Sequence, residues 1–248
     1  MIDTHAHLDA CDDDPAAVLE RARAAGVDRV LAVGSGIASS QAAATLADRE
    51  RGVFAVVGIH PHQAGDTEAG RVADLAPLLR GERVVAVGET GLDFFRDYAP
   101  RRAQRELFAR ELELAHALQK PVVVHARSAD DATAESLAGF DGTVVLHCFS
   151  SPALMDVALE RSYYVSFAGN VTYPRAEELR DAAAKIPPDR ILAETDSPYL
   201  APQPVRGRPN EPANVVHTIA ALAEVRGVDA GSLARHIDAN ATAAFSLP

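Results

Sequence analysis

The sequence predicts an α/β protein whose parallel strands close into a (β/α)8 barrel, the TIM barrel. Apolar, strand-like runs alternate with helical segments from one end of the chain to the other, which is the pattern of repeated βα units around a parallel sheet. Eight such runs can be distinguished, the number that closes a barrel. The length of 248 residues fits the roughly 250 residues of a typical α/β barrel. We therefore expect one domain spanning residues 1–248.

The predicted strands are short, and several are continuously apolar instead of alternating. The runs Pro121–Val124 and Val84–Val87 are examples, and such runs are typical of strands covered on both faces. In chain order, the predicted strands are Met1–Thr4, Arg29–Val33, Val53–Gly58, Val84–Val87, Pro121–Val124, Thr143–Leu146, Tyr163–Phe167 and Ile191–Ala193.

Helices are predicted between these runs, and several open with a proline at or near the first turn, as helix starts favour. In the fourth inter-strand segment, Leu107, Leu114 and Leu118 recur at helical spacing, although Glu111 interrupts the apolar stripe. In chain order, the predicted helices are Pro15–Ala25, Ser39–Arg51, Pro100–Leu118, Pro152–Arg161, Pro174–Lys185 and Asn214–Arg226.

The proline-rich segment Ser197–Pro212 is expected to be a stiff loop, because its prolines exclude a regular helix and an internal strand. It follows Asp196 at a strand end, so it would lie over the mouth of the barrel. Arg206 and Arg208 are then placed to meet an anionic substrate. The alternative is a solvated surface loop.

Charge and composition limit the possible partners. A formal net charge of −11 disfavours a protein that clamps a long duplex, since such proteins usually carry a basic surface. The negative charge is compatible with a protein that holds only the end of a nucleic acid, where metal ions and a few arginines neutralise one or two phosphates. No window approaches the ~18 uncharged apolar residues of a membrane span. The start of the chain lacks a secretion signal, so we expect a soluble, cytoplasmic protein with no membrane contact and no obligate protein partner.

Histidines and carboxylates stand where the apolar runs end. In a parallel α/β protein, strand ends lie on the rim that carries active sites, so residues far apart in the sequence can meet there. Imidazoles and carboxylates gathered at one point are typical of a divalent-metal site. The residues in these positions are His5, His7, His60, His62, Glu89, His125, His147 and Asp196.

Taken alone, most of these signals have an ordinary alternative. A single His-x-His pair, such as His5 and His7, is more often two structural histidines, and Glu89 after an apolar run could pair with an arginine. His125 and His147, however, end two independent strands in the same way, which makes coincidence the poorer explanation.

The candidate ligands exceed what one tetrahedral ion needs, so we predict a site for two divalent ions. Glu89 could bridge the ions with its two oxygens, and Asp196 would accept a proton from the attacking water. Histidine-rich ligation suits Zn²⁺ or Mn²⁺, whereas phosphoryl chemistry often uses Mg²⁺. The predicted ligands are His5, His7, Glu89, His125, His147 and Asp196. The predicted substrate contacts are His60, His62, Arg127, Arg206 and Arg208.

Several motifs, taken in order, resemble the TatD-like metal-dependent hydrolases, and the resemblance spans almost the whole chain. The matching segments are Ile2–Leu8, Gly58–His62, Gly88–Asp93, His125–Arg127, His147–Ser150, Glu194–Leu200 and Arg206–Pro212. The resemblance implies a distorted TIM barrel of the amidohydrolase-like superfamily and a divalent-metal-dependent deoxyribonuclease acting on DNA ends, often 3′ to 5′. By motif position, it places the metal ligands on the same six residues that strand-end reasoning selects.

Three functions remain open at this stage. The leading one is a phosphodiesterase that trims DNA ends or short oligonucleotides. The second is a hydrolase of a small ester, lactone or amide that uses the same metals, since one barrel rim can serve many hydrolyses. The third is a non-catalytic metal-binding or interaction protein, which missing ligands would indicate.

Overall fold

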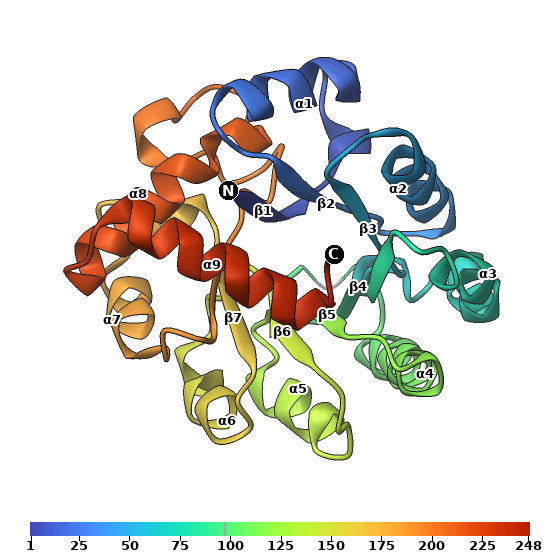
Figure 1. The fold of residues 1–248 in the computed structure, drawn as a ribbon. Helices are drawn as coiled ribbons and strands as arrows, with labels where there is room; N and C mark the ends of the chain where they lie inside the picture. The colour runs from blue at the N-terminus through green and yellow to red at the C-terminus, as the bar shows by residue number, and fades with distance from the viewer. Residues whose placement is uncertain (97) are drawn as a thin grey trace.

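A single sheet of eight parallel strands lies at the centre of the computed structural model, which describes residues 1–96 and 98–248. Each strand pairs with the next one along the chain, in the order β1 to β8. Helices surround the strands (Figure 1). The strands are β1 (Ile2–Ala6), β2 (Arg29–Val33), β3 (Val53–Val57), β4 (Val84–Asp93), β5 (Val122–Arg127), β6 (Val144–Leu146), β7 (Tyr164–Phe167) and β8 (Ile191–Ala193).

The sheet closes through the residues that follow β8. The amide of Asp196 donates a hydrogen bond to the carbonyl of His5 at 3.0 Å, and the amide of His7 donates to the carbonyl of Ser197 at 2.8 Å. Ala6 and Ser197 form a parallel bridge. The predicted TIM barrel is therefore confirmed, with its last seam made by the chain just after β8.

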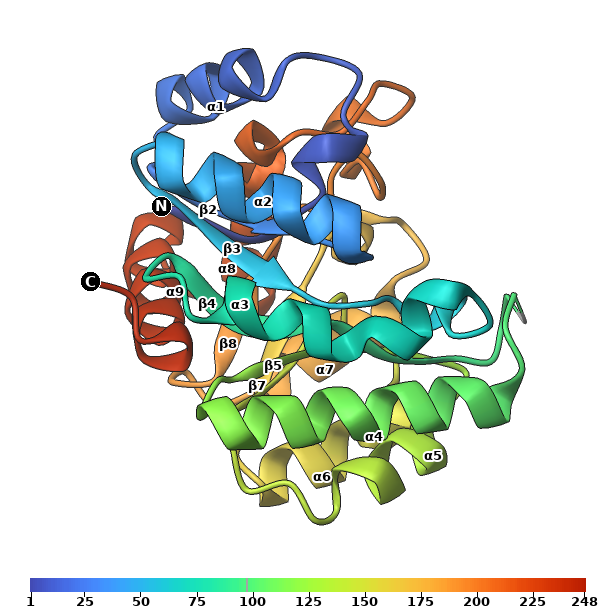
Figure 2. The same ribbon diagram turned by 90° about the vertical axis from the view of Figure 1, so that its right-hand side faces the viewer.

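Helices connect the strands and pack against the outside of the barrel (Figures 1 and 2). The helices are α1 (Pro15–Ala24), α2 (Ile37–Arg49), α3 (Ala76–Leu79), α4 (Arg101–Leu118), α5 (Asp130–Leu137), α6 (Met155–Glu160), α7 (Glu177–Lys185), α8 (Val215–Arg226) and α9 (Ala230–Phe245). None of the helices in the described part of the chain is long and apolar enough to cross a membrane.

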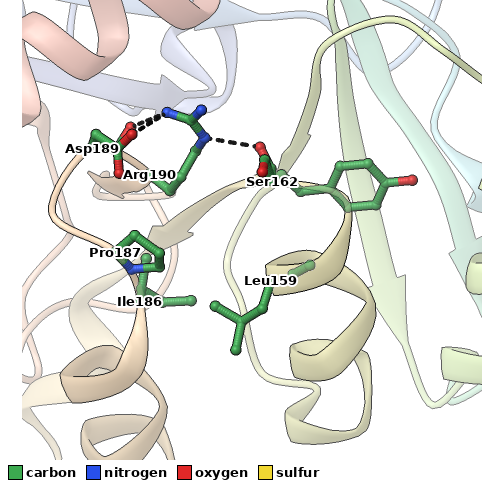
Figure 3. Close-up of a pocket in the computed structure, with 8 residues that line it drawn as sticks. Leu159, Ser162, Ile186, Pro187, Asp189 and Arg190 are labelled. Carbon is green, nitrogen blue, oxygen red and sulfur yellow. Dashed lines mark hydrogen bonds and ion pairs between the residues drawn. The ribbon is translucent and has the colours of Figure 1, made fainter.

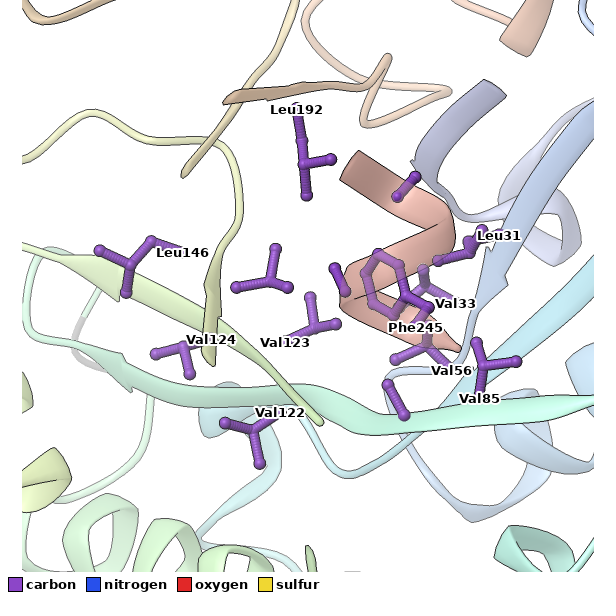
Figure 4. Packing of buried hydrophobic residues seen from close by; sticks show 14 of the residues in the cluster. Leu31, Val33, Val56, Val85, Val122, Val123, Val124, Leu146, Leu192 and Phe245 are labelled. Carbon is purple, nitrogen blue, oxygen red and sulfur yellow. The ribbon is translucent and has the colours of Figure 1, made fainter. Parts of the chain in front are cut away.

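The last helix, α9, lies across the end of the barrel where the strands begin, opposite the loops that follow the strands (Figure 2). The amide group of Asn240 donates to the carbonyls of Pro188 and Ile191 at 2.8 and 2.9 Å, which fixes the helix to the start of β8. Phe245, at its end, packs close to Val33 and Val56 in the core (Figure 4). Helix α9 thus covers the end of the barrel at which the strands begin.

The strands are buried on both faces, as their continuous apolar runs predict. Val122, Val123 and Val124 are each 0% exposed, and every residue of β3 is buried. Each fully buried valine or leucine contributes about 1.5–3 kcal/mol relative to an exposed one. This packing makes the strand ends a rigid frame for the side chains on the rim.

Several parts of the predicted outline were wrong. Three strands run further than expected, β1 to Ala6, β4 to Asp93 and β5 to Arg127, so His5, Glu89 and His125 lie within strands and not after their ends. Helices α3, α5 and α9 were not predicted; α3 has only four residues and α5 eight, and α9 lies beyond the last expected strand. The helices predicted to begin at Pro152 and Pro174 begin at Met155 and Glu177.

Candidate metal centre

The predicted ligands and both predicted histidine contacts meet at the end of the barrel where the strands finish. They lie in or beneath a cavity of about 820 Å³ that opens to solvent. Its lining includes His7, His60, His62, Glu89, His125, His147 and Asp196, while His5 is 0% exposed beneath it. Strand-end reasoning therefore selected residues that share one site.

Glu89 reaches this site because glycines stand on both sides of it in β4. Gly88 has φ +151°, and a Cβ there would lie 2.7 Å from the carbonyl oxygen of Val123. Gly91 has φ +126°, and a Cβ there would lie 2.1 Å from the carbonyl oxygen of His125. Only glycine fits these positions, so the strand can press against β5 and direct Glu89 into the cluster.

One oxygen of Glu89 faces the histidines of β1. Its Oε2 lies 3.4 Å from Nε2 of His5 and 3.3 Å from Nε2 of His7, and the two nitrogens are 3.3 Å apart. Oδ1 of Asp196 lies 3.9 and 3.6 Å from the same nitrogens. Ligands about 2.0–2.1 Å from a tetrahedral ion are about 3.3–3.4 Å from one another. This donor set therefore fits a divalent ion.

The other oxygen of Glu89 faces a second pair of histidines. Its Oε1 lies 2.9 Å from Nδ1 of His125 and 2.8 Å from Nε2 of His147, and those nitrogens are 3.3 Å apart. The rings come from β5 and from the end of β6. A carboxylate with one oxygen toward each imidazole pair has the arrangement that a bridging ligand needs.

The remaining ring nitrogen of three of these histidines is held by an acceptor. Nδ1 of His7 lies 3.1 Å from the carbonyl oxygen of Val33, and Nδ1 of His147 lies 3.1 Å from Oε1 of Glu194. Nε2 of His125 lies 3.3 Å from Oδ2 of Asp93. A proton on each of these nitrogens leaves the other ring nitrogen, the one beside Glu89, as the atom that would bind an ion once its own proton is lost, as is usual for metal-binding histidines.

His60 also approaches Glu89, but its tautomer argues for a different role. Its Nε2 lies 3.3 Å from Oε1 of Glu89, while its Nδ1 accepts a hydrogen bond from the amide of His62 at 3.1 Å. The accepting Nδ1 carries no proton, so the neutral ring bears its proton on Nε2 and donates toward Glu89. Burial lowers the pKa of His60 to about 4, which keeps the ring neutral. In the metal-free structure His60 thus acts as a hydrogen-bond donor toward Glu89, although its ring also lies close enough to Glu89 and His125 to share an ion with them.

His62 joins the site through Asp93, which is 0% exposed. Nε2 of His62 lies 2.8 Å from Oδ2 of Asp93, the same oxygen that faces His125. The other oxygen of Asp93 accepts the amides of Phe95 and Arg96, each at 2.9 Å. Asp93 therefore fixes both rings and the loop that follows β4.

Burial and the opposing charges set the protonation of the metal-free cluster. Burial would raise the pKa of Glu89, but the surrounding imidazoles, His147 and His60 first among them, hold it well below its usual range. Burial lowers the pKa of His5 to about 4. Burial also opposes the charged form of His7, yet the hydrogen bond and charge of Glu89 raise its pKa to about 9. Without an ion, protons on some of the rings balance the carboxylates.

Sequence reasoning overlooked two buried carboxylates that position the candidate ligands. Glu194 is 0% exposed and accepts from His147 and from the amide of Cys148, the latter at 2.8 Å. Asp3 accepts from the amide and the hydroxyl of Thr195 at 2.9 and 2.5 Å, which fastens β1 to the segment carrying Asp196. A signal was present in the sequence, since both are single carboxylates next to apolar runs.

The structure places the predicted arginine contacts in different parts of the molecule. Arg127 lines the site cavity, together with Arg96, which was not predicted. Arg208 lines a separate cleft of about 420 Å³ beside α1. The guanidinium carbon of Arg206 lies 4.1 Å from the ring centre of Tyr173. The proline-rich loop therefore directs these two arginines elsewhere than the cavity that holds Glu89.

A much smaller cavity, of about 70 Å³, lies where β7 and β8 begin. Arg190 closes it by pairing with Asp189 at 2.8 Å and donating to the carbonyl of Ser162 at 3.0 Å (Figure 3). Leu159, Ile186 and Pro187 supply the apolar wall. The charged groups that line this cavity are paired with one another or with the backbone, and we assign it no function.

Comparison with known proteins identifies the family. The family model described as TatD related DNase matches residues 2–246. This chain belongs to the TatD family of metal-dependent hydrolases. A *Mycobacterium tuberculosis* relative named "Uncharacterized metal-dependent hydrolase TatD" is 39% identical, covering 100% of this chain and 98% of its own. A relative from *Erwinia billingiae* named "3'-5' ssDNA/RNA exonuclease TatD" is 37% identical, over 93% of this chain and 92% of its own.

Among solved structures, the TatD homologue YjjV from *Escherichia coli* K12 superposes with a TM-score of 0.93. It is 32% identical, over 100% of this chain and 98% of its own. A TatD family hydrolase from *Entamoeba histolytica* has a TM-score of 0.87 at 18% identity, which shows a shared fold. The family places this TatD protein among the metal-dependent hydrolases, in agreement with the donors around Glu89.

Proposed function

We propose that this protein is a divalent-metal-dependent exonuclease that removes nucleotides from the 3′ ends of DNA through a site for two ions. The observation that carries the proposal is the orientation of Glu89, whose two oxygens each face a different pair of imidazoles. The relatives named as 3′–5′ ssDNA/RNA exonucleases support the choice of substrate.

The proposed holders of the ions follow from the contacts of Glu89. His5, His7 and Asp196 would hold one ion with Oε2, and His125 and His147 the other with Oε1. Mg²⁺, Mn²⁺ and Zn²⁺ are the candidate ions. When bound, two divalent ions supply an activated water at neutral pH and neutralise charge on the attacking and leaving oxygens.

The side chains then divide the remaining work. Asp196 is only 14% exposed and lines the cavity, so its carboxylate can take the proton of the attacking water. As the water oxygen bonds to phosphorus, the bond from phosphorus to the leaving oxygen breaks, and the leaving oxygen takes up a proton from Asp196 or from solvent. Arg127 and Arg96 line the cavity and can hold the non-bridging phosphate oxygens. His62 is partly exposed on the same wall, where its ring can contact the bound nucleotide.

The test is turnover of end-labelled single- and double-stranded DNA by metal-stripped protein that is resupplied separately with Mg²⁺, Mn²⁺ or Zn²⁺. The expected result is a ladder shortened from the 3′ end that requires added metal and is lost in the Asp196→Asn variant. Metal analysis of both proteins checks that the variant still binds ions.

Absence of DNA cleavage with every metal, from protein shown to bind two ions, would refute the nuclease proposal. The second candidate, hydrolysis of a small ester, lactone or amide by the same residues, would then be tested on a panel of such substrates. One bound ion at saturation would refute the two-ion arrangement while leaving the choice of substrate open.

A further inference from the structure

Three of the large exposed hydrophobic side chains in the described part of the chain are aromatic. Tyr98 and Tyr199 line the cavity of the metal centre, and Phe95 lies against Arg127, which also lines it. Phe95, Tyr98 and Tyr199 are 60%, 65% and 55% exposed. Phe95 and Tyr98 follow the end of β4, and Tyr199 follows Asp196. Aromatic rings left in water around a polar cavity are a common sign of a binding surface.

The two tyrosines flank the cluster from opposite directions. The ring centre of Tyr98 lies 4.8 Å from that of His62, with the rings edge to face. The ring centre of Tyr199 lies 6.0 Å from that of His7, also edge to face. His7 faces Oε2 of Glu89, whereas His62 is joined through Asp93 to His125, which faces Oε1. A ligand lying across Glu89 would therefore have one tyrosine on each side.

Cations accompany the rings on the Tyr98 side. The guanidinium carbon of Arg127 lies 4.2 Å from the ring centre of Phe95, and that of Arg96 lies 6.0 Å from it. The amide of Phe94 donates to the carbonyl of Arg127 at 2.9 Å, which fastens this loop to the end of β5. In a chain with a net charge of −11, this places positive charge where a phosphate chain would enter.

We propose that Tyr98 and Tyr199 stack on the unpaired bases that flank the scissile phosphate, with Arg96 and Arg127 holding the backbone. The inference rests on the proposed nuclease function and adds to it two residues that bind the bases of the substrate. Stacking on aromatic rings tolerates every base, because each base has a π-face. The two rings therefore bind unpaired bases of any sequence.

The first measurement compares Tyr98→Ala and Tyr199→Ala with the wild type on a single-stranded oligonucleotide and on matched oligonucleotides that lack individual bases near the cleaved end. Each substitution is expected to raise KM about tenfold on the intact strand, because one stacked base is lost. On the strand that already lacks the partner base, the same substitution should change KM less than twofold.

Matched variants separate stacking from damage to the fold. Tyr98→Phe and Tyr199→Phe keep the ring and should keep the wild-type KM. Leu159→Ala removes another exposed hydrophobic side chain, 38% exposed and on α6, and should leave KM unchanged. Unaltered metal content in all variants excludes an indirect effect on the ions.

The proposal is overturned if the tyrosine variants bind and cleave intact strands as the wild type does. It is also overturned if they lose the same factor on intact and base-free strands. Binding of a labelled oligonucleotide to an Asp196→Asn background, measured by fluorescence anisotropy, tests stacking without turnover. Base-dependent binding without cleavage by the wild type would refute the nuclease function alone, whereas cleavage without base dependence would refute the stacking surface alone.

Discussion

Glu89 is the residue on which both halves of the centre depend, because its two oxygens face separate imidazole pairs. Replacing it with alanine should abolish turnover and reduce the number of bound ions while leaving the barrel folded. Removal of a buried charge that is surrounded by donors would not by itself unfold strands packed as closely as β3 to β5. Turnover, metal content and far-ultraviolet circular dichroism of Glu89→Ala measure these three outcomes. Wild-type turnover after metal reloading would rule out the bridging role.

Glu194 offers a test of how the ligands are oriented. It holds Nδ1 of His147 at 3.1 Å, and Glu194→Gln would weaken that acceptor and favour the wrong tautomer of the ring. We expect a loss of about 10- to 100-fold in metal affinity, the usual effect of removing such a partner. Competition with a metal-sensitive dye measures the affinity. Glu160→Gln, an exposed carboxylate at the end of α6, is the matched control.

The element scale shows what the amphipathic pattern of α4 concealed. Glu111 interrupts the apolar stripe, yet it is 0% exposed. Its Oε1 accepts the amide of Ile59 at 2.8 Å, and its Oε2 accepts the hydroxyl of Thr90 at 2.6 Å. Those neighbours adjoin His60 and Glu89, so α4 fixes the segment after β3 and the middle of β4 beside the site. The apparent defect in the stripe is a buried polar connection.

Glu111 also makes stability depend on pH. Burial raises its pKa to about 8, from an ordinary value of 4.5, so the folded state holds a proton that the unfolded chain has lost. Neutral Glu111 makes its full contribution to the free energy of unfolding below pH 4.5, and this contribution declines as the pH rises toward 8. In metal-free protein, Glu111→Gln should therefore gain stability relative to the wild type between pH 5 and 8, by a few kcal/mol at most.

Urea unfolding at pH 5, 6.5 and 8 measures this difference. Glu113→Gln, on the exposed face of the same helix, should follow the wild type at each pH. A pH-independent gap between Glu111→Gln and the wild type would mean that the Glu111 carboxylate titrates alike in the folded and unfolded states. That result would exclude the neutral buried acid.

The strands and the site follow from the sequence to different degrees. Strands that are buried on both faces need continuous apolar runs, so these strands can be predicted from the sequence. The polar residues at the ends of the runs mark the rim of the barrel. The extension of β4 through Gly88 and Gly91 could not be predicted from the sequence, because a glycine usually signals the end of a strand. Here the glycines serve close contact with β5, which depends on a neighbour more than 30 residues away in the chain.

Other features arise only when elements pack together. Arg206 and Arg208 were expected over the mouth, but Arg206 stacks on Tyr173 and Arg208 lines the cleft beside α1. The course of a proline-rich loop depends on such contacts and not on its own composition. The ligand set, the two-ion stoichiometry and the cytoplasmic location stay predictions.

At the scale of the whole molecule, metal binding and proton release should be linked. Glu89 raises the pKa of His7 to about 9 against the opposing effect of burial, and the pKa of His147 is raised well above its usual value by Glu89 and Glu194. A cation must displace protons from these rings, so metal affinity should increase as pH rises from about 6 to 9. Binding should also raise Tm, since the ion binds the folded state.

Calorimetric titration in buffers of different ionisation enthalpy counts the released protons, and thermal unfolding with increasing metal at pH 6.5 and 8.5 measures the linkage. A larger rise in Tm at pH 8.5 is expected at equal metal concentration. Equal rises at both pH values, with no proton release, would mean that the histidines are already unprotonated in the metal-free protein.

The seam between β1 and the chain after β8 gives a way to follow the metal centre without turnover. Its two closing hydrogen bonds use the amides of His7 and Asp196, and both residues also supply candidate ligand atoms. Opening of the seam would therefore also move these candidate ligand atoms apart. Slow hydrogen exchange at these two amides, observed by NMR, should report ion occupancy directly: exchange would quicken at the seam first when the ions are withdrawn, while the amides of β3 and β5 stay protected.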